Sequence, residues 1–253
     1  IGRLVGSEMC IRDSRDTDLK LVSKRIVWGK FLNSGQTCVA PDYLIVHKSI
    51  KGTLIKELID RIELTFDKNF DNTSDITAIV NEKNFNRLTE LIKENKIIYG
   101  GKSDRENRYI FPTIIDSPKM DSNIMKEEIF GPILPVLSFE KLEDIDKIIN
   151  KNPNPLALYV FSNNKKFTET VINRYSFGGG SINDTIVHLA NSRLPFGGVG
   201  NSGIGSYHGK LSFELFSHKK SIVNRSTWFD NSLRYAPYKN KLSLVRKLMK
   251  YLG

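Results

Sequence analysis

Cys38 is the residue best suited to covalent chemistry, because a thiolate is an intrinsically strong nucleophile. It lies just after the turn formers Asn33-Ser34-Gly35, which end an amphipathic helix, and just before a short apolar strand. A loop on a rigid scaffold can direct such a side chain into a cleft. Local context leaves a second interpretation open, since a cysteine outside a disulfide is often buried and inert.

A second candidate segment is Lys126–Pro132, where Glu127 and Glu128 are followed by Phe130. A carboxylate can accept hydrogen bonds from the vicinal hydroxyls of a ribose. Without further information, however, the two glutamates are interpreted as solvated acids in the first turn of a helix. Phe196 in the loop Leu194–Gly200 is likewise interpreted as loop packing.

One string match is rejected. Gly198–Gly203 fits the glycine pattern of dinucleotide-binding loops, G-x-G-x-x-G. Such a loop must follow a buried strand, open a helix, and precede an acidic residue by about twenty positions. Pro195 upstream and Gly205 downstream are incompatible with that context. We therefore predict a flexible loop at the mouth of a site, without phosphate binding.

The elements that must position these residues alternate between strand and helix. The first helix is predicted from Asp16, with Asp16 or Thr17 as its N-cap and with Leu19, Val22, Ile26, Val27 and Phe31 on its apolar face. Strands are predicted at residues 43–46, 97–99, 133–139 and 156–161. Between them lie helices marked by Ile50, Leu54, Leu58 and Ile62, by Phe85, Leu88, Leu91 and Ile92, by Leu142, Ile145, Ile148 and Ile149, and by Phe167, Val171 and Ile172. This alternation predicts an α/β domain with a largely parallel sheet flanked by helices.

Both ends of the chain depart from this pattern. Residues 1–14, IGRLVGSEMCIRDS, have neither helical nor strand periodicity and are interpreted as a non-native leader outside the fold. Beyond Phe213 the pattern weakens, and Ser221–Asn224 is a candidate for one isolated strand. Residues 241–253 then predict a short basic amphipathic helix, with an apolar stripe of Leu242, Val245, Leu248, Met249 and Leu252.

Composition limits the classes of function. The 253 residues are 40% hydrophobic and 26% charged, as in an ordinary globular protein, and no apolar run reaches the length of a membrane span. The net charge of +10 is scattered and is not interleaved with stacking aromatics, so we expect no nucleic-acid partner. Two cysteines form no disulfide framework, which favours the cytoplasm.

Three motifs together resemble the aldehyde dehydrogenase superfamily, in particular its class 3 (fatty and aromatic aldehyde) branch. They are RIVWGKFLNSGQTCVAPDYLIVH at Arg25–His47, KEEIFGP at Lys126–Pro132, and LPFGGVG at Leu194–Gly200, which continues through Ser202-Gly203 to Tyr207–Lys210. They occur in family order and with similar intervals, and the resemblance extends over about Asp16 to Pro237. Ala-Pro-Asp-Tyr at residues 40–43 is the part most typical of class 3.

The resemblance implies a role for each candidate residue. Cys38 would attack an aldehyde carbonyl, giving a thiohemiacetal and then a thioester, with its backbone N–H helping to stabilise the oxyanion. Glu128 would bind the ribose next to the nicotinamide of NAD or NADP, Phe130 would pack near the nicotinamide, and Phe196 would border the substrate entrance. Gln36 and Thr37 would shape the turn and would not react. No metal is expected.

The resemblance also implies missing parts. Family members carry an earlier cofactor domain and a Glu-Leu-Gly-Gly segment with the general base, and this sequence contains no Glu-Leu-Gly-Gly. The chain is therefore expected to be an inactive fragment in which residues 15–213 form the catalytic domain. Residues 214–240 would form the oligomerisation strand and tail of a homodimer, and the helix at residues 241–253 would either cap the substrate entrance or contact an anionic membrane. A CoA-acylating aldehyde dehydrogenase and a non-catalytic scaffold or membrane-surface module of the same fold remain as alternatives.

Overall fold

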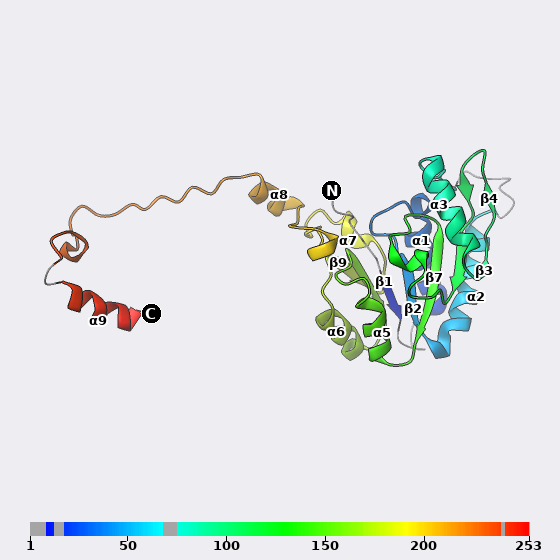
Figure 1. The fold of residues 1–253 in the computed structure, drawn as a ribbon, viewed down its shortest axis with the longest axis horizontal. Helices are drawn as coiled ribbons and strands as arrows, with labels where there is room; N and C mark the ends of the chain where they lie inside the picture. Colours follow the sequence, from blue (N-terminus) through cyan, green and yellow to red (C-terminus); the bar gives the residue numbers. More distant parts are fainter. Residues whose placement is uncertain (1–8, 13–17, 68–74, 239–240, 253) are drawn as a thin grey trace. The chain divides into compact units, whose positions relative to one another are not determined.

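A computed structural model describes residues 9–12, 18–67, 75–238 and 241–252, which divide into two compact units, Ile1–Phe216 and Ser217–Gly253. The described part of the first unit is built on a seven-stranded sheet of order β3-β6-β7-β2-β1-β8-β9 (Figure 1). Its strands are β1 (Met9–Arg12), β2 (Tyr43–His47), β3 (Ile97–Tyr99), β6 (Thr113–Asp116), β7 (Ile133–Phe139), β8 (Ala157–Phe161) and β9 (Gly179–Ile182). Only the β3–β6 pair in this sheet is antiparallel. The predicted α/β class with a largely parallel sheet is confirmed.

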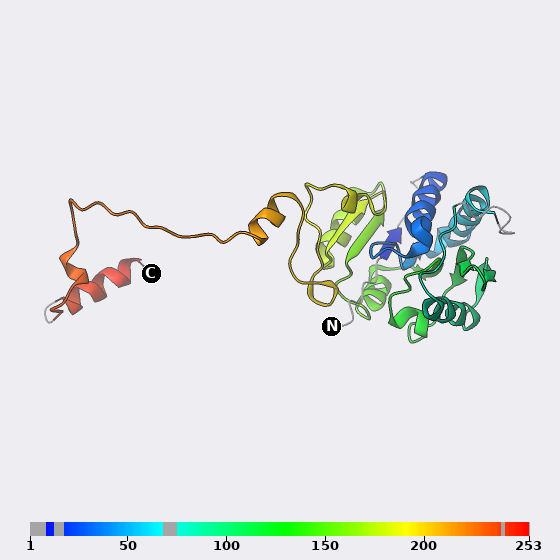
Figure 2. The same ribbon diagram turned by 90° about the horizontal axis from the view of Figure 1, so that it is seen from above.

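Helices cover both faces of this sheet. The described α-helices of this unit are α1 (Leu19–Phe31), α2 (Lys48–Thr65), α3 (Glu82–Lys93), α4 (Asn123–Lys126), α5 (Leu142–Ile149), α6 (Lys165–Arg174), α7 (Val187–Ala190) and α8 (Gly209–Leu215), of which α8 buries no residue. A small hairpin of β4 (Ser103–Asp104) and β5 (Tyr109–Ile110) lies apart from the sheet. Figure 2 shows the blue and cyan helices α1 and α2 side by side on one face.

Alternation along the strands divides the apolar core into two clusters. In β2, Leu44 and Val46 pack with the inward faces of α1 and α2, whereas Tyr43 and Ile45 pack with α3, α5 and α6. Successive side chains of a strand point to opposite faces, so a central strand buried on both sides must be apolar throughout. The helix residues predicted to face the core are mostly buried, including every member of the Ile50–Ile62 and Phe85–Ile92 sets.

Two predictions about the amino-terminal part of the chain were wrong. Met9–Arg12, assigned to a leader outside the fold, form the strand β1 between β2 and β8; the rest of residues 1–14 lies outside the described residues. Four residues are too few to display a period, and main-chain pairing on both sides suffices to place them in a sheet. The helix α1 has Asp18 as its N-cap, since its carboxylate accepts from the Lys20 N–H at 2.9 Å. Asp16 and Thr17 lie outside the described residues.

The second unit contains a short 3-10 turn, Ser232–Arg234, and the helix α9 (Leu242–Leu252). The helix predicted near the C-terminus is thus confirmed, and its apolar residues Leu242, Leu248 and Met249 are exposed. Ser221–Asn224 is exposed and forms no strand. A strand needs a second segment to pair with, and the described residues of this unit supply none. No described helix has the length and apolarity needed to cross a membrane.

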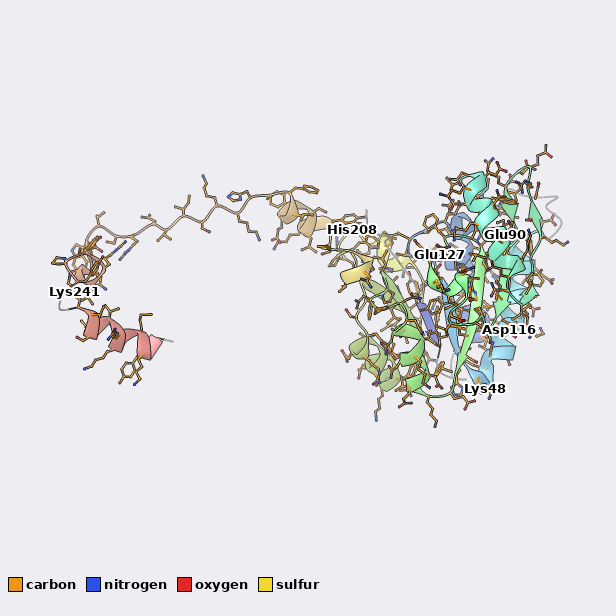
Figure 3. All side chains as sticks on the ribbon, viewed as in Figure 1. Lys48, Glu90, Asp116, Glu127, His208 and Lys241 are labelled. Carbon is orange, nitrogen blue, oxygen red and sulfur yellow. The ribbon has the colours of Figure 1, made fainter. Side chains whose placement is uncertain are left out.

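The parallel strands bring several loops to one edge of the sheet. The segments that precede β2, β7 and β8 all meet at the amino edge, since these strands run in the same direction. In Figure 3, Glu127 and His208 lie at this end of the unit, and Lys48, which directly follows β2, lies at the other. The candidate residues are found at this amino edge.

Candidate active site

The turn that carries Cys38 begins with unusual backbone geometry. After α1 the chain passes through Asn33, Ser34 and Gly35 in left-handed conformations, with φ of 53°, 52° and 74°. Such conformations cost energy for residues other than glycine and persist only where neighbouring groups hold them. Ser34 is buried, and its hydroxyl donates to the Thr77 carbonyl at 2.6 Å.

Cys38 itself occupies a tight turn. The Ala40 N–H donates to the Thr37 carbonyl at 2.9 Å, so Cys38 is one of the two central residues of that turn, and its side chain is exposed. Gln36 anchors the preceding residues: its side-chain amide donates to the Ala78 carbonyl at 3.1 Å and accepts from the Val80 N–H at 2.9 Å. These bonds agree with the prediction that Gln36 shapes the turn.

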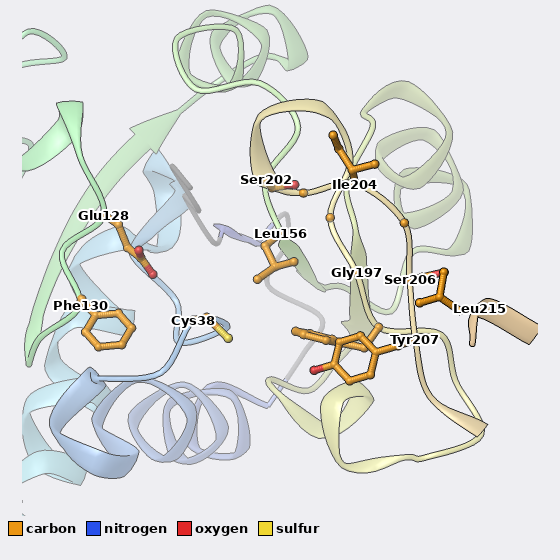
Figure 4. Close-up of a pocket in the computed structure, with 14 residues that line it drawn as sticks. Cys38, Glu128, Phe130, Leu156, Gly197, Ser202, Ile204, Ser206, Tyr207 and Leu215 are labelled. Carbon is orange, nitrogen blue, oxygen red and sulfur yellow. The ribbon is translucent and has the colours of Figure 1, made fainter. Parts of the chain in front are cut away.

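One cavity of about 440 Å³ brings the candidate residues together. Cys38, Glu128, Phe130 and Phe196 all line it, and Figure 4 shows Glu128 and Phe130 on one side of Cys38 and Tyr207 on the other. The rest of the lining consists of Leu156, Gly197, Gly198, Ser202, Gly203, Ile204, Gly205, Ser206, Tyr207 and Leu215. The glycine-rich string at Gly198–Gly203 is a loop with one short 3-10 turn in the wall of this cavity.

The segment containing Glu128 is held by its main chain. Arg87 of α3 donates to the Ile129 carbonyl at 2.6 Å and to the Glu128 carbonyl at 3.3 Å. The buried carboxylate of Asp42 accepts from the Ile129 N–H at 3.2 Å, which links the region after Cys38 to the region around Glu128. Phe130, which lies two residues after Glu128, has a left-handed backbone conformation with φ of 48°. Its side chain lines the cavity and is partly exposed.

A buried ion pair lies beneath this segment. The Nζ of Lys30, a fully buried residue of α1, is 3.9 Å from Oδ1 of Asp42. Burial raises the pKa of Asp42 to about 6, although Lys30 acts in the opposite direction. Burial also raises the pKa of Glu128 to about 7, and repulsion from Asp42 adds to that rise while Lys30 and Arg87 oppose it. Burial and the charge of Asp42 therefore both disfavour the charged form of the Glu128 carboxylate.

Aromatic and histidine rings form the wall around Phe196. His208 stacks on Phe196 with ring centroids 5.9 Å apart, and Tyr207 meets it edge-on at 5.7 Å. The His188 ring centroid lies 6.3 Å from that of Phe196, and burial lowers the pKa of His188. Phe196 and Tyr207 also exchange two backbone hydrogen bonds of 2.9 Å, which fixes this loop against itself.

Comparison with known proteins decides the family. Residues 8–222 match the Aldehyde dehydrogenase family. This chain belongs to that family. It is 46% identical to an Arabidopsis thaliana protein named aldehyde dehydrogenase family 3 member H1, over 97% of this chain and 52% of the relative.

Two further relatives of this aldehyde dehydrogenase chain agree. The Mus musculus "Aldehyde dehydrogenase, dimeric NADP-preferring" is 44% identical over 94% of this chain and 53% of the relative. A solved structure of Staphylococcus aureus AldH in a substrate-bound state has a TM-score of 0.87 and 46% identity, and covers 97% of this chain and 54% of that chain. The resemblance to class 3 is confirmed. The chain spans about half the length of the curated relatives it matches.

The interpretation of the sequence missed several residues of this aldehyde dehydrogenase site. Lys30, Asp42 and Arg87 hold the Glu128 segment, and Tyr159 of β8 donates to the Val39 carbonyl at 2.8 Å. Two of them were recognisable. Lys30 lies four residues after Ile26 on the apolar face of a helix, where a lysine is buried and therefore needs a partner for its charge. Tyr159 carries the one polar side chain of an otherwise apolar strand. Within the described ranges, no three His, Cys, Asp or Glu side chains form a group suited to a metal ion.

Proposed function

We propose that the whole protein of which this chain is a part oxidises aldehydes to carboxylic acids with NAD or NADP, and that Cys38 is its nucleophile. The observation that carries the proposal is the exposure of Cys38 in one cavity with Glu128, Phe130 and Phe196. Membership of the aldehyde dehydrogenase family supports the reaction type.

Cys38 performs the covalent steps. Its thiolate forms a bond to the carbonyl carbon, the π electrons move to oxygen, and the backbone N–H of Cys38 stabilises the resulting oxyanion. NAD or NADP, when bound, would supply the acceptor for the hydride that leaves this thiohemiacetal. The sulfur is then part of a thioester, which water cleaves to release the acid and restore the thiolate.

The residues on the Glu128 side of the cavity fit a nicotinamide ribose. A carboxylate accepts hydrogen bonds from vicinal hydroxyls, and the Glu128 side chain lines the cavity beside the partly exposed ring of Phe130. We assign ribose binding to Glu128 and packing near the nicotinamide to Phe130. The name of the mouse relative, which is NADP-preferring, agrees with a nicotinamide cofactor without deciding between NAD and NADP.

The opposite wall favours an apolar substrate. Leu156, Phe196, Ile204 and Tyr207 line the cavity, and such side chains bind medium or long alkyl chains and aromatic rings through burial of apolar surface. We therefore propose fatty or aromatic aldehydes as the substrates, with Phe196 at the entrance. The CoA-acylating alternative is disfavoured by the class 3 signature at residues 40–43.

Kinetics of the whole protein test the proposal. Cys38→Ala should abolish NAD(P)-dependent oxidation of a fatty aldehyde such as decanal, and the wild type should release the free acid whether or not CoA is present. Formation of acyl-CoA would favour the alternative, and substantial turnover by Cys38→Ala would contradict the proposal. The 253-residue chain alone should not reduce NAD(P), because the earlier half of its relatives is expected to carry the cofactor domain and general base.

The ends of the chain are proposed to serve assembly in a cytoplasmic enzyme. We assign residues 15–213 to the catalytic domain and residues 214–240 to a tail whose Lys219–Arg225 segment pairs with a second subunit in a homodimer. The dimeric name of the mouse relative supports this assignment. A shift to monomer in light scattering after deletion of residues 217–253 would agree with it, whereas an unchanged oligomer would contradict it.

Residues 241–253 are proposed to contact an anionic membrane surface. In α9, Leu242, Leu248 and Met249 are exposed, and Arg246, Lys247 and Lys250 lie on the same helix. Each basic residue close to such a surface contributes about 1 kcal/mol. Sedimentation with phosphatidylserine vesicles at low and high salt tests this, with neutral vesicles as control. Equal binding to both vesicle types, or none at low salt, would instead favour a cap over the substrate entrance.

A further inference from the structure

We propose that Tyr159 is a positioning residue for Cys38, whose hydroxyl holds the turn bearing the thiol in the geometry required for attack. The inference rests on the proposed function of Cys38 as nucleophile. It assigns no contact between Tyr159 and substrate. Tyr159 acts through the backbone of Val39, the residue directly after Cys38.

The contact is buried and long-range. Tyr159 lies in β8 and Val39 in the turn before β2, and both are 0% exposed. The Tyr159 hydroxyl donates to the Val39 carbonyl at 2.8 Å across 120 positions of sequence. A buried carbonyl left without a donor loses its hydrogen bond to water without replacement, so a partner at this point determines which turn geometry is stable.

The turn is fixed separately on its two sides. On the amino side, Gln36 is bound to the main chain at Ala78 and Val80. On the carboxyl side, the Val39 carbonyl is held by Tyr159. The peptide between Val39 and Ala40 belongs to the same turn that the Ala40 N–H closes onto Thr37. Loss of the hydroxyl therefore frees that peptide to rotate, and the direction of the Cys38 side chain changes with it.

The ring of Tyr159 also packs toward the wall of the cavity. Its centroid lies 5.8 Å from that of His188, whose ring is in turn 6.3 Å from Phe196. Replacement by phenylalanine keeps this ring packing and removes only the hydroxyl. Tyr159→Phe therefore separates positioning of the turn from support of the wall.

Tyr175→Phe is a matched control. Tyr175 is 9% exposed, packs in the cluster on the other face of the sheet, and donates its hydroxyl to Asp146 at 2.8 Å. Both variants delete one hydrogen-bonded tyrosine hydroxyl. Only Tyr159 contacts the turn that carries Cys38.

Amide hydrogen exchange of the 253-residue chain is the first measurement. Tyr159→Phe should accelerate exchange of the Ala40 N–H by about tenfold, the factor expected from losing one buried hydrogen bond, while amides of β8 stay protected and Tyr175→Phe leaves Ala40 unchanged. Unaltered exchange at Ala40 in Tyr159→Phe, or equal acceleration in the control, would overturn the proposal. This readout does not depend on any enzymatic activity.

Kinetics of the whole protein are the second measurement. In Tyr159→Phe, kcat should fall by about tenfold or more with an unchanged KM, because misplacing a nucleophile affects attack more than binding. A rise in KM alone would overturn the positioning role. Faster Ala40 exchange together with an active Cys38→Ala variant would confirm that Tyr159 holds the turn and would refute the proposed function of Cys38 instead.

Discussion

Replacement of Lys30 by methionine tests the buried ion pair that supports the site. Methionine keeps a flexible side chain of similar length and removes the charge. Lys30 is 0% exposed and lies 3.9 Å from Asp42, which is itself buried and accepts the Ile129 N–H. The substitution therefore leaves a buried carboxylate without its nearest cation.

The expected cost follows from this geometry. Two unit charges 3.9 Å apart attract by about 4 kcal/mol at an effective dielectric constant of about 20. Removing one member of a buried pair costs about 3 to 5 kcal/mol, because the other charge stays desolvated. We expect Lys30→Met to lower the free energy of unfolding by that amount at pH 8.

The loss should depend on pH. Burial raises the pKa of Asp42 to about 6 and Lys30 opposes the rise, so removing Lys30 raises that pKa further. For an acid whose pKa is higher in the folded state, the folded protein binds the proton more tightly, and stability falls as pH rises through the window between the unfolded and folded pKa values. In Lys30→Met this window extends above 6. At pH 5 Asp42 is largely neutral, and the cost should drop below about 1 kcal/mol.

Urea unfolding from pH 5 to pH 8 measures this difference. Lys56→Met is the control, since Lys56 pairs with Asp60 on the exposed surface of α2 at 2.6 Å, and exposed pairs contribute at most about 1 kcal/mol. A cost of Lys30→Met that is equally large at pH 5 and pH 8, or no larger than that of Lys56→Met, would refute the argument from a buried pair.

Three other substitutions have defined outcomes. Glu128→Gln removes a half-buried acid whose pKa is raised to about 7. The wild type loses stability as pH rises from about 4.5 to 7, because the buried carboxylate becomes charged, and the variant should not show this loss. After a discount for solvent screening, urea unfolding should show the variant about 1 to 2 kcal/mol more stable than the wild type at pH 8 and equally stable at pH 4. Gly35→Ala introduces a Cβ at φ +74°, 2.3 Å from the Gly131 carbonyl oxygen, and should destabilise by more than about 2 kcal/mol in thermal unfolding. Gly52→Ala in α2, where a Cβ meets nothing within 4 Å, should instead stabilise by about 0.5 to 1 kcal/mol.

The order and faces of the elements were predictable because they depend on local periodicity. The spacing of Ile50, Leu54, Leu58 and Ile62 identified a helix and its buried side without knowledge of the partner. The strand β1 was not predictable in this way, since its position results from main-chain pairing with β2 and β8. The prediction of a strand at Ser221–Asn224 was wrong for the opposite reason. The composition of this segment favours a strand, but a strand requires a partner.

The chemical residues of the site were predictable only through motifs. Nothing in the periodicity brings Cys38 and Glu128 together, because 90 positions separate them; the parallel arrangement of β2 and β7 does so. Ligands in open α/β sheets usually bind beyond the carboxyl ends of the strands, and this cavity lies at the amino edge. General fold rules would therefore have directed the search to the wrong edge. The hydrogen-bond partners of Asp42 and Tyr159 could not be predicted from the sequence, because they depend on the three-dimensional fold.

Mass spectrometry of the trapped acyl-enzyme tests the central claim most directly. The whole protein is mixed with NAD or NADP and excess decanal, quenched in acid within one turnover, and digested. We predict a decanoyl thioester on the peptide that contains Cys38, and no adduct in Cys38→Ala. A decanoyl group on another residue, or acid formed at the wild-type rate by Cys38→Ala, would contradict the account.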